Sequence, residues 1–120
     1  MARILAVDDS PSMRRMVSVT LASAGHSVEQ AADGCDALAA AKREVFDLIV
    51  TDVNMPNMDG ITLVKQLREI AEYKFVPLLI LTTEATPERK SQGKEAGATG
   101  WLVKPFNPER LLAIVAKVVR

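Results

Sequence analysis

The chain alternates short apolar runs with longer stretches in which apolar and polar residues are mixed. Apolar runs occur at 3–7, 47–51 and 77–82, and shorter ones lie near 27–31 and 100–103. Continuous apolar runs of this length are typical of strands buried on both faces of a parallel sheet. The pattern therefore predicts five strands.

Helix signals fill the intervals between these runs. Ser10-Pro11 and Asn107-Pro108 place a proline in the first turn of a helix, where proline is tolerated. Gly25 and Gly97 stand where helices would stop. The five predicted helices cover the stretch from Pro11 to Gly25 and the ranges 35–43, 59–70, 87–96 and 107–119.

Strand and helix signals follow one another five times, which predicts an α/β domain. Parallel strands joined by right-handed helical crossovers are the expected result. In the first helix, residues that recur at helical spacing predict a face buried in the core: Met13, Met16, Val17, Thr20 and Leu21. Residues 1–120 leave no room for a linker or a second domain, so we expect a single domain without an attached output domain.

Composition argues against a disordered, nucleic-acid-binding or membrane protein. The chain is 48% hydrophobic, which argues against disorder, and its 15 basic and 15 acidic residues balance, so no global charge indicates nucleic acid or membrane as a partner. We find neither a signal peptide nor an apolar segment of the roughly 18–20 residues that a membrane span needs, and expect a cytoplasmic protein. The single cysteine, Cys35, suits a reducing compartment, and we expect it to be buried.

The charges are unevenly spread along the chain. Residues 1–83 carry 8 basic and 11 acidic side chains, whereas residues 84–120 carry 7 and 4. The basic part is either a surface that faces a partner or ordinary solvated surface.

Polar residues stand at the ends of the predicted strands. Asp8 and Asp9 follow the apolar run at 3–7, and Asp52 follows the run at 47–51. Thr82 ends the run at 77–82, and Lys104 follows the run at 100–103. In open parallel sheets, ligands bind outside the carboxyl ends of the strands, so these side chains should converge there. Clustered carboxylates repel one another unless a counter-ion is present, and Mg²⁺ prefers oxygen ligands. We therefore predict a Mg²⁺ site, with Mn²⁺ as a possible substitute, to which the backbone carbonyl of Asn54 could add a ligand.

Asp52 is the best candidate nucleophile, because carboxylates can form aspartyl-phosphates without a general base. The cation and Lys104 would neutralise phosphoryl oxygens, and the Thr82 hydroxyl could donate to another. His26, the single histidine, is expected in an exposed turn without a functional role. The chain contains no phosphate-binding glycine loop, so nucleotide binding has no support.

Four motifs resemble the receiver domain of two-component response regulators, most closely the single-domain chemotaxis type: VDDSPSMRRMV, TDVNMPNMDG, LTTEA and VKPF. The resemblance implies a flavodoxin-like, doubly wound five-stranded sheet of order 2-1-3-4-5 with five helices. It implies that Asp52 accepts phosphate from a histidine kinase and that Asp8, Asp9 and the Asn54 carbonyl bind Mg²⁺. It also implies phosphoryl contacts from Thr82, Thr83 and Lys104, and often a cis peptide bond before Pro105.

The resemblance gives further residues roles in phosphate lifetime and switching. Asn54 and Glu84 occupy the two positions that tune dephosphorylation, and this pair predicts a short-lived acyl phosphate. Trp101 stands where the family usually has tyrosine, a residue that turns inward when the switch threonine, here Thr82, moves toward the phosphate. An indole N–H needs a partner when buried, so Trp101 either finds one or stays on the surface.

The output surface is expected on the fourth helix, the fifth strand and the fifth helix. Its residues would be Arg89, Lys90, Lys94, Trp101, Lys104 and Lys117. The expected partner is an output protein such as the flagellar motor switch, bound by a monomer that catalyses no reaction beyond its own phosphotransfer and dephosphorylation. A phosphorelay shuttle or phosphate sink remains an alternative.

Two other classes fit the sequence less well. A turnover phosphatase usually has an acid two residues after its nucleophile, where this chain has Asn54. A flavin-binding domain would need a phosphate-cradling loop after the first strand, where the sequence DDSPSMRR brings acids instead.

Overall fold

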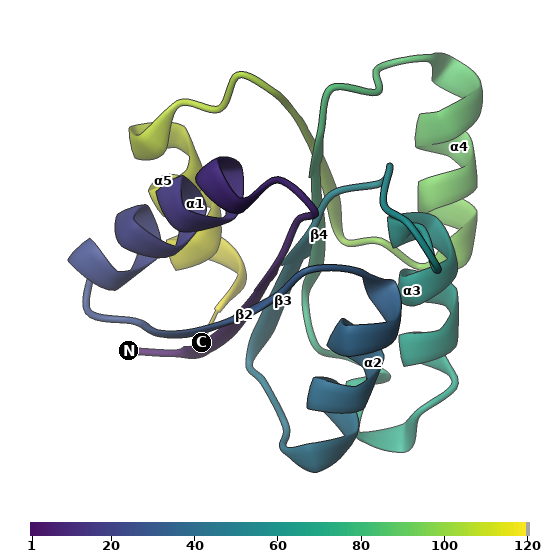
Figure 1. Cartoon of the computed structure of the whole chain (residues 1–120), viewed down its shortest axis with the longest axis horizontal. Helices are drawn as coiled ribbons and strands as arrows, with labels where there is room; N and C mark the ends of the chain where they lie inside the picture. Colours follow the sequence, from purple (N-terminus) through teal and green to yellow (C-terminus); the bar gives the residue numbers. More distant parts are fainter. Residues whose placement is uncertain (120) are drawn as a thin grey trace.

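The computed structural model describes residues 1–119 and shows a parallel sheet between two layers of helices (Figure 1). All neighbouring strands pair in parallel, in the order β2-β1-β3-β4-β5. The five strands are β1 (Arg3–Val7), β2 (Ser27–Ala31), β3 (Leu48–Thr51), β4 (Leu78–Thr82) and β5 (Gly100–Val103). The prediction of a doubly wound α/β sheet of order 2-1-3-4-5 is confirmed.

Each strand is followed by a helix. The helices are α1 (Pro11–Ser23), α2 (Gly34–Arg43), α3 (Gly60–Arg68), α4 (Pro87–Ala96) and α5 (Pro108–Val118). Figure 1 shows α1 and α5 on one side of the sheet and α2, α3 and α4 on the other. The predicted third helix ends earlier than expected, and a short 3₁₀ helix, η1 (Ala71–Tyr73), follows it.

A side chain caps the first turn of every one of these α-helices. In α1, the Ser10 Oγ accepts a hydrogen bond from the Met13 amide, and in α2 an oxygen of Asp33 accepts one from the Asp36 amide. The other caps are Asp59, Thr86 and Asn107. Each such cap contributes about 1 kcal/mol. Together they fix where each helix begins, immediately after the loops that leave the carboxyl ends of the strands.

The core lies on both faces of the sheet, because alternate residues of the strands point in opposite directions. In β1, Leu5 and Val7 belong to the cluster beneath α2 and α3, whereas Ile4 and Ala6 belong to the cluster beneath α1 and α5. All four are at most 3% exposed. This burial on two faces explains why the strands read as continuous apolar runs in the sequence.

Three predictions about individual side chains were wrong. Met16 is 54% exposed, because the buried stripe of α1 runs along Val17, Ser18 and Leu21, of which Val17 and Leu21 were predicted. Cys35 is exposed at the start of α2, since that helix buries its alanine face. His26 is half-buried, and its Nδ1 accepts a hydrogen bond of 3.0 Å from the Ala2 amide. None of the described helices is both long enough and apolar enough to cross a membrane.

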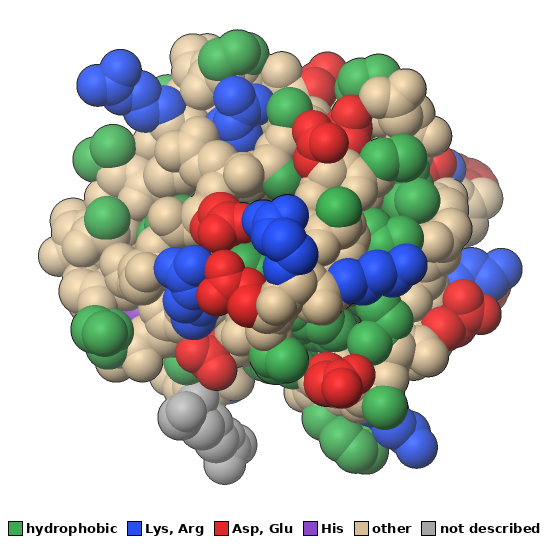
Figure 2. Space-filling model, turned by 60° about the horizontal axis from the view of Figure 1, so that its bottom comes forward, with side chains coloured by type: hydrophobic (Ala, Val, Ile, Leu, Met, Phe, Trp, Pro, Cys, Tyr) green, Lys and Arg blue, Asp and Glu red, His purple; other side chains and the backbone are tan. Residues whose placement is uncertain are grey.

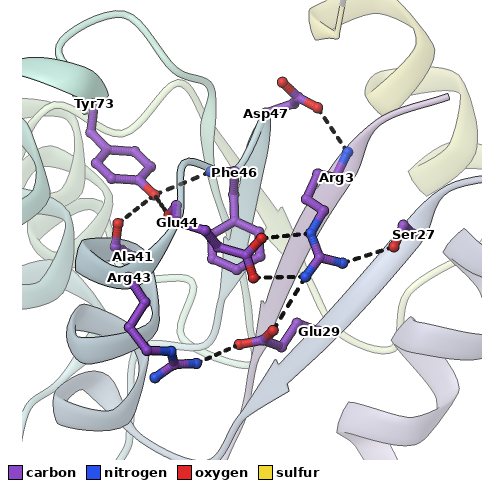
Figure 3. Close-up of polar contacts among 9 residues, drawn as sticks. All are labelled: Arg3, Ser27, Glu29, Ala41, Arg43, Glu44, Phe46, Asp47 and Tyr73. Carbon is purple, nitrogen blue, oxygen red and sulfur yellow. Dashed lines mark hydrogen bonds and ion pairs between the residues drawn. The ribbon is translucent and has the colours of Figure 1, made fainter.

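Charged side chains of both signs gather where α2 leads into β3. Figure 2 brings the lower part of Figure 1 forward and shows acidic and basic groups interleaved near the centre of the view. In Figure 3, the Arg3 guanidinium points at the carboxylates of Glu29 and Glu44, at 3.4 and 2.7 Å. The Arg3 amide also donates to Asp47 at 2.8 Å. These contacts fasten the α2–β3 connection to the start of β1.

Candidate functional site

The backbone places three site residues directly beyond the ends of their strands. The Asp8 amide donates to the Ala31 carbonyl at 3.2 Å, and the Asp52 amide donates to the Val7 carbonyl at 3.0 Å. The Lys104 amide donates to the carbonyl of Thr82 at 2.8 Å. The backbone of each residue is therefore hydrogen-bonded to a neighbouring strand, and its side chain lies at the edge of the sheet.

The carboxylates of Asp8, Asp9 and Asp52 meet at this edge, as predicted. One oxygen from each lies within 4.8 Å of the others. Asp8 and Asp52 are buried, whereas Asp9 is exposed. Oxygen donors at this spacing, with one side open to solvent, suit a hard divalent cation that keeps several of its waters. The residues present therefore fit the predicted Mg²⁺ site.

Lys104 bridges two of the three acids. Its Nζ donates to Asp8 Oδ2 at 2.8 Å and to Asp52 Oδ2 at 3.0 Å. The side chains of these three residues are 9%, 6% and 11% exposed. Burial opposes the charge on the amine, but the hydrogen bonds and negative charges of Asp8 and Asp52 outweigh it, so the pKa of Lys104 is raised. The amine therefore stays protonated beside the candidate nucleophile.

The second oxygens of the two buried acids are held by backbone amides. Asp52 Oδ1 accepts from the Val53 amide at 2.6 Å, and Asp8 Oδ1 accepts from the Ser10 amide at 2.9 Å. Each carboxylate thus directs one oxygen to the backbone and the other to Lys104, which fixes the direction of the remaining lone pairs.

Thr82 lies beside this cluster but uses its side chain differently. It is fully buried, and its Oγ1 accepts a hydrogen bond of 3.2 Å from the Glu84 amide. Because the hydroxyl acts as the acceptor there, its proton remains available for another oxygen. Thr83, the next residue, is exposed.

Trp101, in β5, is half-buried against α4, and its indole N–H has a hydrogen-bond acceptor. The Nε1 donates to the Glu84 carbonyl at 2.9 Å. The backbone N–H and C=O of Glu84 therefore contact the Thr82 hydroxyl and the Trp101 indole, respectively, while the Glu84 carboxylate lies 3.8 Å from Arg89. The structure thus places both predicted switch residues, and the lifetime-tuning position between them, on one hydrogen-bonded path.

The predicted partner residues are only partly brought together, and the placement of Lys104 on this surface was wrong, because its side chain is buried against Asp8 and Asp52. Lys90, Lys94 and Trp101 line a shallow pocket of about 270 Å³ beside the edge strand β5. Arg89 lies near Glu84 instead, and Lys117 is exposed on α5 and does not line this pocket.

The loop between β3 and α3 contains Asn54, which is exposed. Sequence reasoning missed the importance of Gly60 here: a Cβ at this position would overlap the carbonyl of Asp52. The signal was present as the Asp-Gly pair that ends the TDVNMPNMDG motif. In the loop after β5, the Lys104–Pro105 peptide bond is cis, as the resemblance implied.

Comparison with known proteins agrees with the fold and the acidic cluster. Residues 4–116 match the Response regulator receiver domain family, and the chain belongs to this family. Response regulator receiver domains take phosphate from histidine kinases and are not classical enzymes.

Curated relatives differ in length. The chain is 41% identical over 117 residues to chemotaxis protein CheY-3 of Vibrio cholerae, and the match covers 97% of this chain and 90% of that protein. It is 42% identical over 102 residues to a gliding motility regulatory protein of Myxococcus xanthus, but that match covers only 13% of the larger protein.

Solved structures show the same fold. The chemotaxis response regulator CheY4 of Vibrio cholerae superposes with a TM-score of 0.93 at 59% identity, and the match covers 99% of both chains. The receiver domain of the sensor histidine kinase PA1611 of Pseudomonas aeruginosa, solved with a magnesium ion coordinated in its active-site cleft, gives a TM-score of 0.91 at 30% identity over 98% of this chain and 96% of that one.

Proposed function

We propose that this protein is a phospho-accepting response regulator of a two-component system that controls chemotaxis, with Asp52 as the residue that takes the phosphoryl group from a histidine kinase. The observation that supports phosphate acceptance is the contact of Lys104 with both Asp8 and Asp52 beside the exposed Asp9, and the 59% identity to CheY4 supports the role in chemotaxis. The candidate nucleophile Asp52, the ammonium group of Lys104 and the carboxylates of Asp8 and Asp9 lie together at the edge of the sheet.

This geometry supports phosphotransfer to Asp52. A carboxylate oxygen of Asp52 forms a bond to phosphorus while the bond from phosphorus to the donor's nitrogen or oxygen breaks, so no general base is needed. Asp8, Asp9, Asp52 and the Asn54 carbonyl would hold Mg²⁺, or Mn²⁺ in its place, which supplies positive charge to the phosphoryl oxygens when bound. Lys104 neutralises another phosphoryl oxygen, and the free proton of Thr82 is donated to one more. Thr83 offers an additional hydroxyl at the rim.

The phosphorylated state is expected to be short-lived. Asn54 lies exposed two residues after Asp52, and Glu84 lies two residues after Thr82. This pair resembles that of the chemotaxis-type receivers, in which the acyl phosphate is short-lived. A phosphorylated lifetime of many hours for the isolated chain would contradict this part of the proposal.

Output passes through α4, β5 and α5. Contacts of the phosphoryl group with Thr82 and Lys104 bias an equilibrium between two conformers, and the backbone of Glu84, bonded to both Thr82 and Trp101, transmits the change to Trp101. The surface formed by Arg89, Lys90, Lys94, Trp101 and Lys117 then binds an output protein, such as the flagellar motor switch, in the cytoplasm. Replacing Trp101 by alanine should change partner affinity and leave phosphorylation intact.

The decisive test is the intact mass of the protein after incubation with Mg²⁺ and acetyl phosphate, beside an Asp52→Ala variant. A single phosphoryl adduct that requires Mg²⁺ and is missing from the variant supports the proposal. If no adduct is observed, Mg²⁺-dependent release of inorganic phosphate distinguishes rapid hydrolysis from an inactive site. Absence of both adduct and phosphate release would overturn the proposal.

A further inference from the structure

The end of β2 and the turn that leads into α2 contact two segments around the acidic site. On one side, the Ala31 carbonyl accepts the amide hydrogen of Asp8 at 3.2 Å. On the other side, the Asp33 carboxylate accepts a hydrogen bond of 2.7 Å from the Asn57 side-chain amide, in the loop that follows Asp52. This turn therefore braces both segments that supply the predicted cation ligands.

Backbone contacts make the second attachment close. The Gly34 amide donates to the Met58 carbonyl at 3.2 Å, and a Cβ at position 34 would lie 2.5 Å from that same oxygen. Gly34 is therefore required for the turn and the loop to approach one another. Asn57 has a φ of +68°, the left-handed region that asparagine tolerates better than most residues.

Asp33 is itself rigidly held. Its Oδ1 caps α2 by accepting from the Asp36 amide at 2.8 Å, and its Oδ2 accepts from Asn57. The pKa of the Asp33 carboxyl is lowered, first by the bond from Asp36 and then by that from Asn57. An ionised carboxylate fixed by a helix start is thus the anchor for the middle of the β3–α3 loop.

We propose that Asp33 and Asn57 are positioning residues for the cation site: their hydrogen bond holds the β3–α3 loop in the conformation that presents the Asn54 carbonyl to the cation. The inference rests on the proposed function, because it assumes a cation at Asp8, Asp9 and Asp52. The physical reason is that the loop is exposed at Asn54 and would otherwise have to be ordered when the cation binds. Hydrogen bonds that orient metal ligands typically change metal affinity by 10- to 100-fold when removed.

The test measures Mn²⁺ affinity at constant ionic strength, from the electron paramagnetic resonance signal of free Mn²⁺. Asn57→Gly removes the amide and keeps a residue that accepts φ of +68°. It should weaken Mn²⁺ binding roughly tenfold. Asp33→Asn should weaken it too. The exchanged pair Asp33→Asn/Asn57→Asp restores an amide–carboxylate bond at unchanged net charge and should recover affinity to within about twofold.

Asp36→Asn is the matched control. Asp36 is exposed in the first turn of α2, so this variant removes the same charge as Asp33→Asn while leaving the bond to Asn57 in place. It should change Mn²⁺ affinity by less than about twofold, since exposed charges are strongly screened. All variants are compared at a temperature where circular dichroism shows them folded, so that a loss of stability alone does not alter the affinity.

Two results would overturn this inference while leaving the proposed function intact: unchanged Mn²⁺ affinity in Asn57→Gly, or an equal loss in Asp36→Asn and Asp33→Asn. Failure of the wild-type protein to bind Mn²⁺ would instead remove the proposed function and the inference together. The wild-type titration therefore separates the two failures.

Discussion

The ring of Trp101 lies against the backbone of Gly93, so closely that a Cβ at position 93 would come within 2.6 Å of the ring atom Cζ3. Gly93 stands inside α4, where glycine costs up to about 1 kcal/mol relative to alanine. This glycine lies in the turn of α4 against which the indole packs. The half-buried position of Trp101, with its N–H bonded to Glu84, thus depends on the missing side chain.

Gly93→Ala should displace the indole from α4. Trp101 is the only tryptophan in the chain, so intrinsic fluorescence reports on it alone. We expect emission at longer wavelength and stronger quenching by acrylamide, because the ring becomes more exposed. Ser91→Ala, at an exposed position of the same helix, is the control and should leave the spectrum unchanged. Identical spectra for Gly93→Ala and wild type would contradict the steric argument.

Lys104→Met should destabilise the protein when no divalent cation is added. Methionine keeps the length of the side chain but leaves Asp8 and Asp52 without the charge that separates them. Removing one partner of a buried ion pair typically costs about 3–5 kcal/mol, and the partial exposure of this site favours the lower end. Urea unfolding measures the change, and Lys94→Met, which removes an exposed lysine, should stay within about 0.5 kcal/mol of wild type.

The same variant should bind Mn²⁺ or Mg²⁺ more tightly than the wild type. The ammonium lies 2.8 and 3.0 Å from two of the cation's predicted ligands, so its removal relieves a repulsion. Added Mg²⁺ should therefore recover part of the lost stability, whereas phosphorylation by acetyl phosphate should fall. Equal or weaker metal affinity in Lys104→Met would show that the amine and the cation do not compete.

Alkaline pH should remove the stabilisation that Lys104 provides. Its pKa in the folded state is raised above the ordinary value of 10.5, so the contribution is complete below that value and is lost as pH rises through the folded pKa. The difference in unfolding free energy between wild type and Lys104→Met should be constant from about pH 7 to 9 and shrink above about pH 10.5. A difference that vanishes by pH 8 would mean that the ion pair contributes little.

Tyr73→Phe should destabilise the chain without affecting the acidic site. The fully buried hydroxyl accepts from the Phe46 amide at 3.1 Å and lies within 2.9 Å of the carbonyls of Ala41 and Glu44 (Figure 3). Its loss leaves a buried N–H unpaired, which costs about 1–3 kcal/mol. Urea unfolding and a Mn²⁺ titration together test this. Phe75→Leu, at a position that is 88% exposed, serves as the control.

Much of the architecture could be read from local pattern. The ranges predicted for β1, β2 and β5 match the observed strands, and Pro11 and Pro108 begin the helices that they predicted. Strands buried on two faces carry continuous apolar runs, and this signal depends on neighbouring residues alone. The boundary of α3 was harder to place, because the chain passes into a 3₁₀ turn that the apolar pattern does not mark.

The sequence by itself determined the meeting of Asp8, Asp9 and Asp52, because parallel strands bring their carboxyl ends to one edge of a sheet. Only the tertiary structure decided how side chains far apart in the chain pair with one another. Lys104 contacts Asp8 across 96 positions, and Asn57 contacts Asp33 across 24. Such contacts depend on register, loop path and side-chain direction, which local periodicity does not encode.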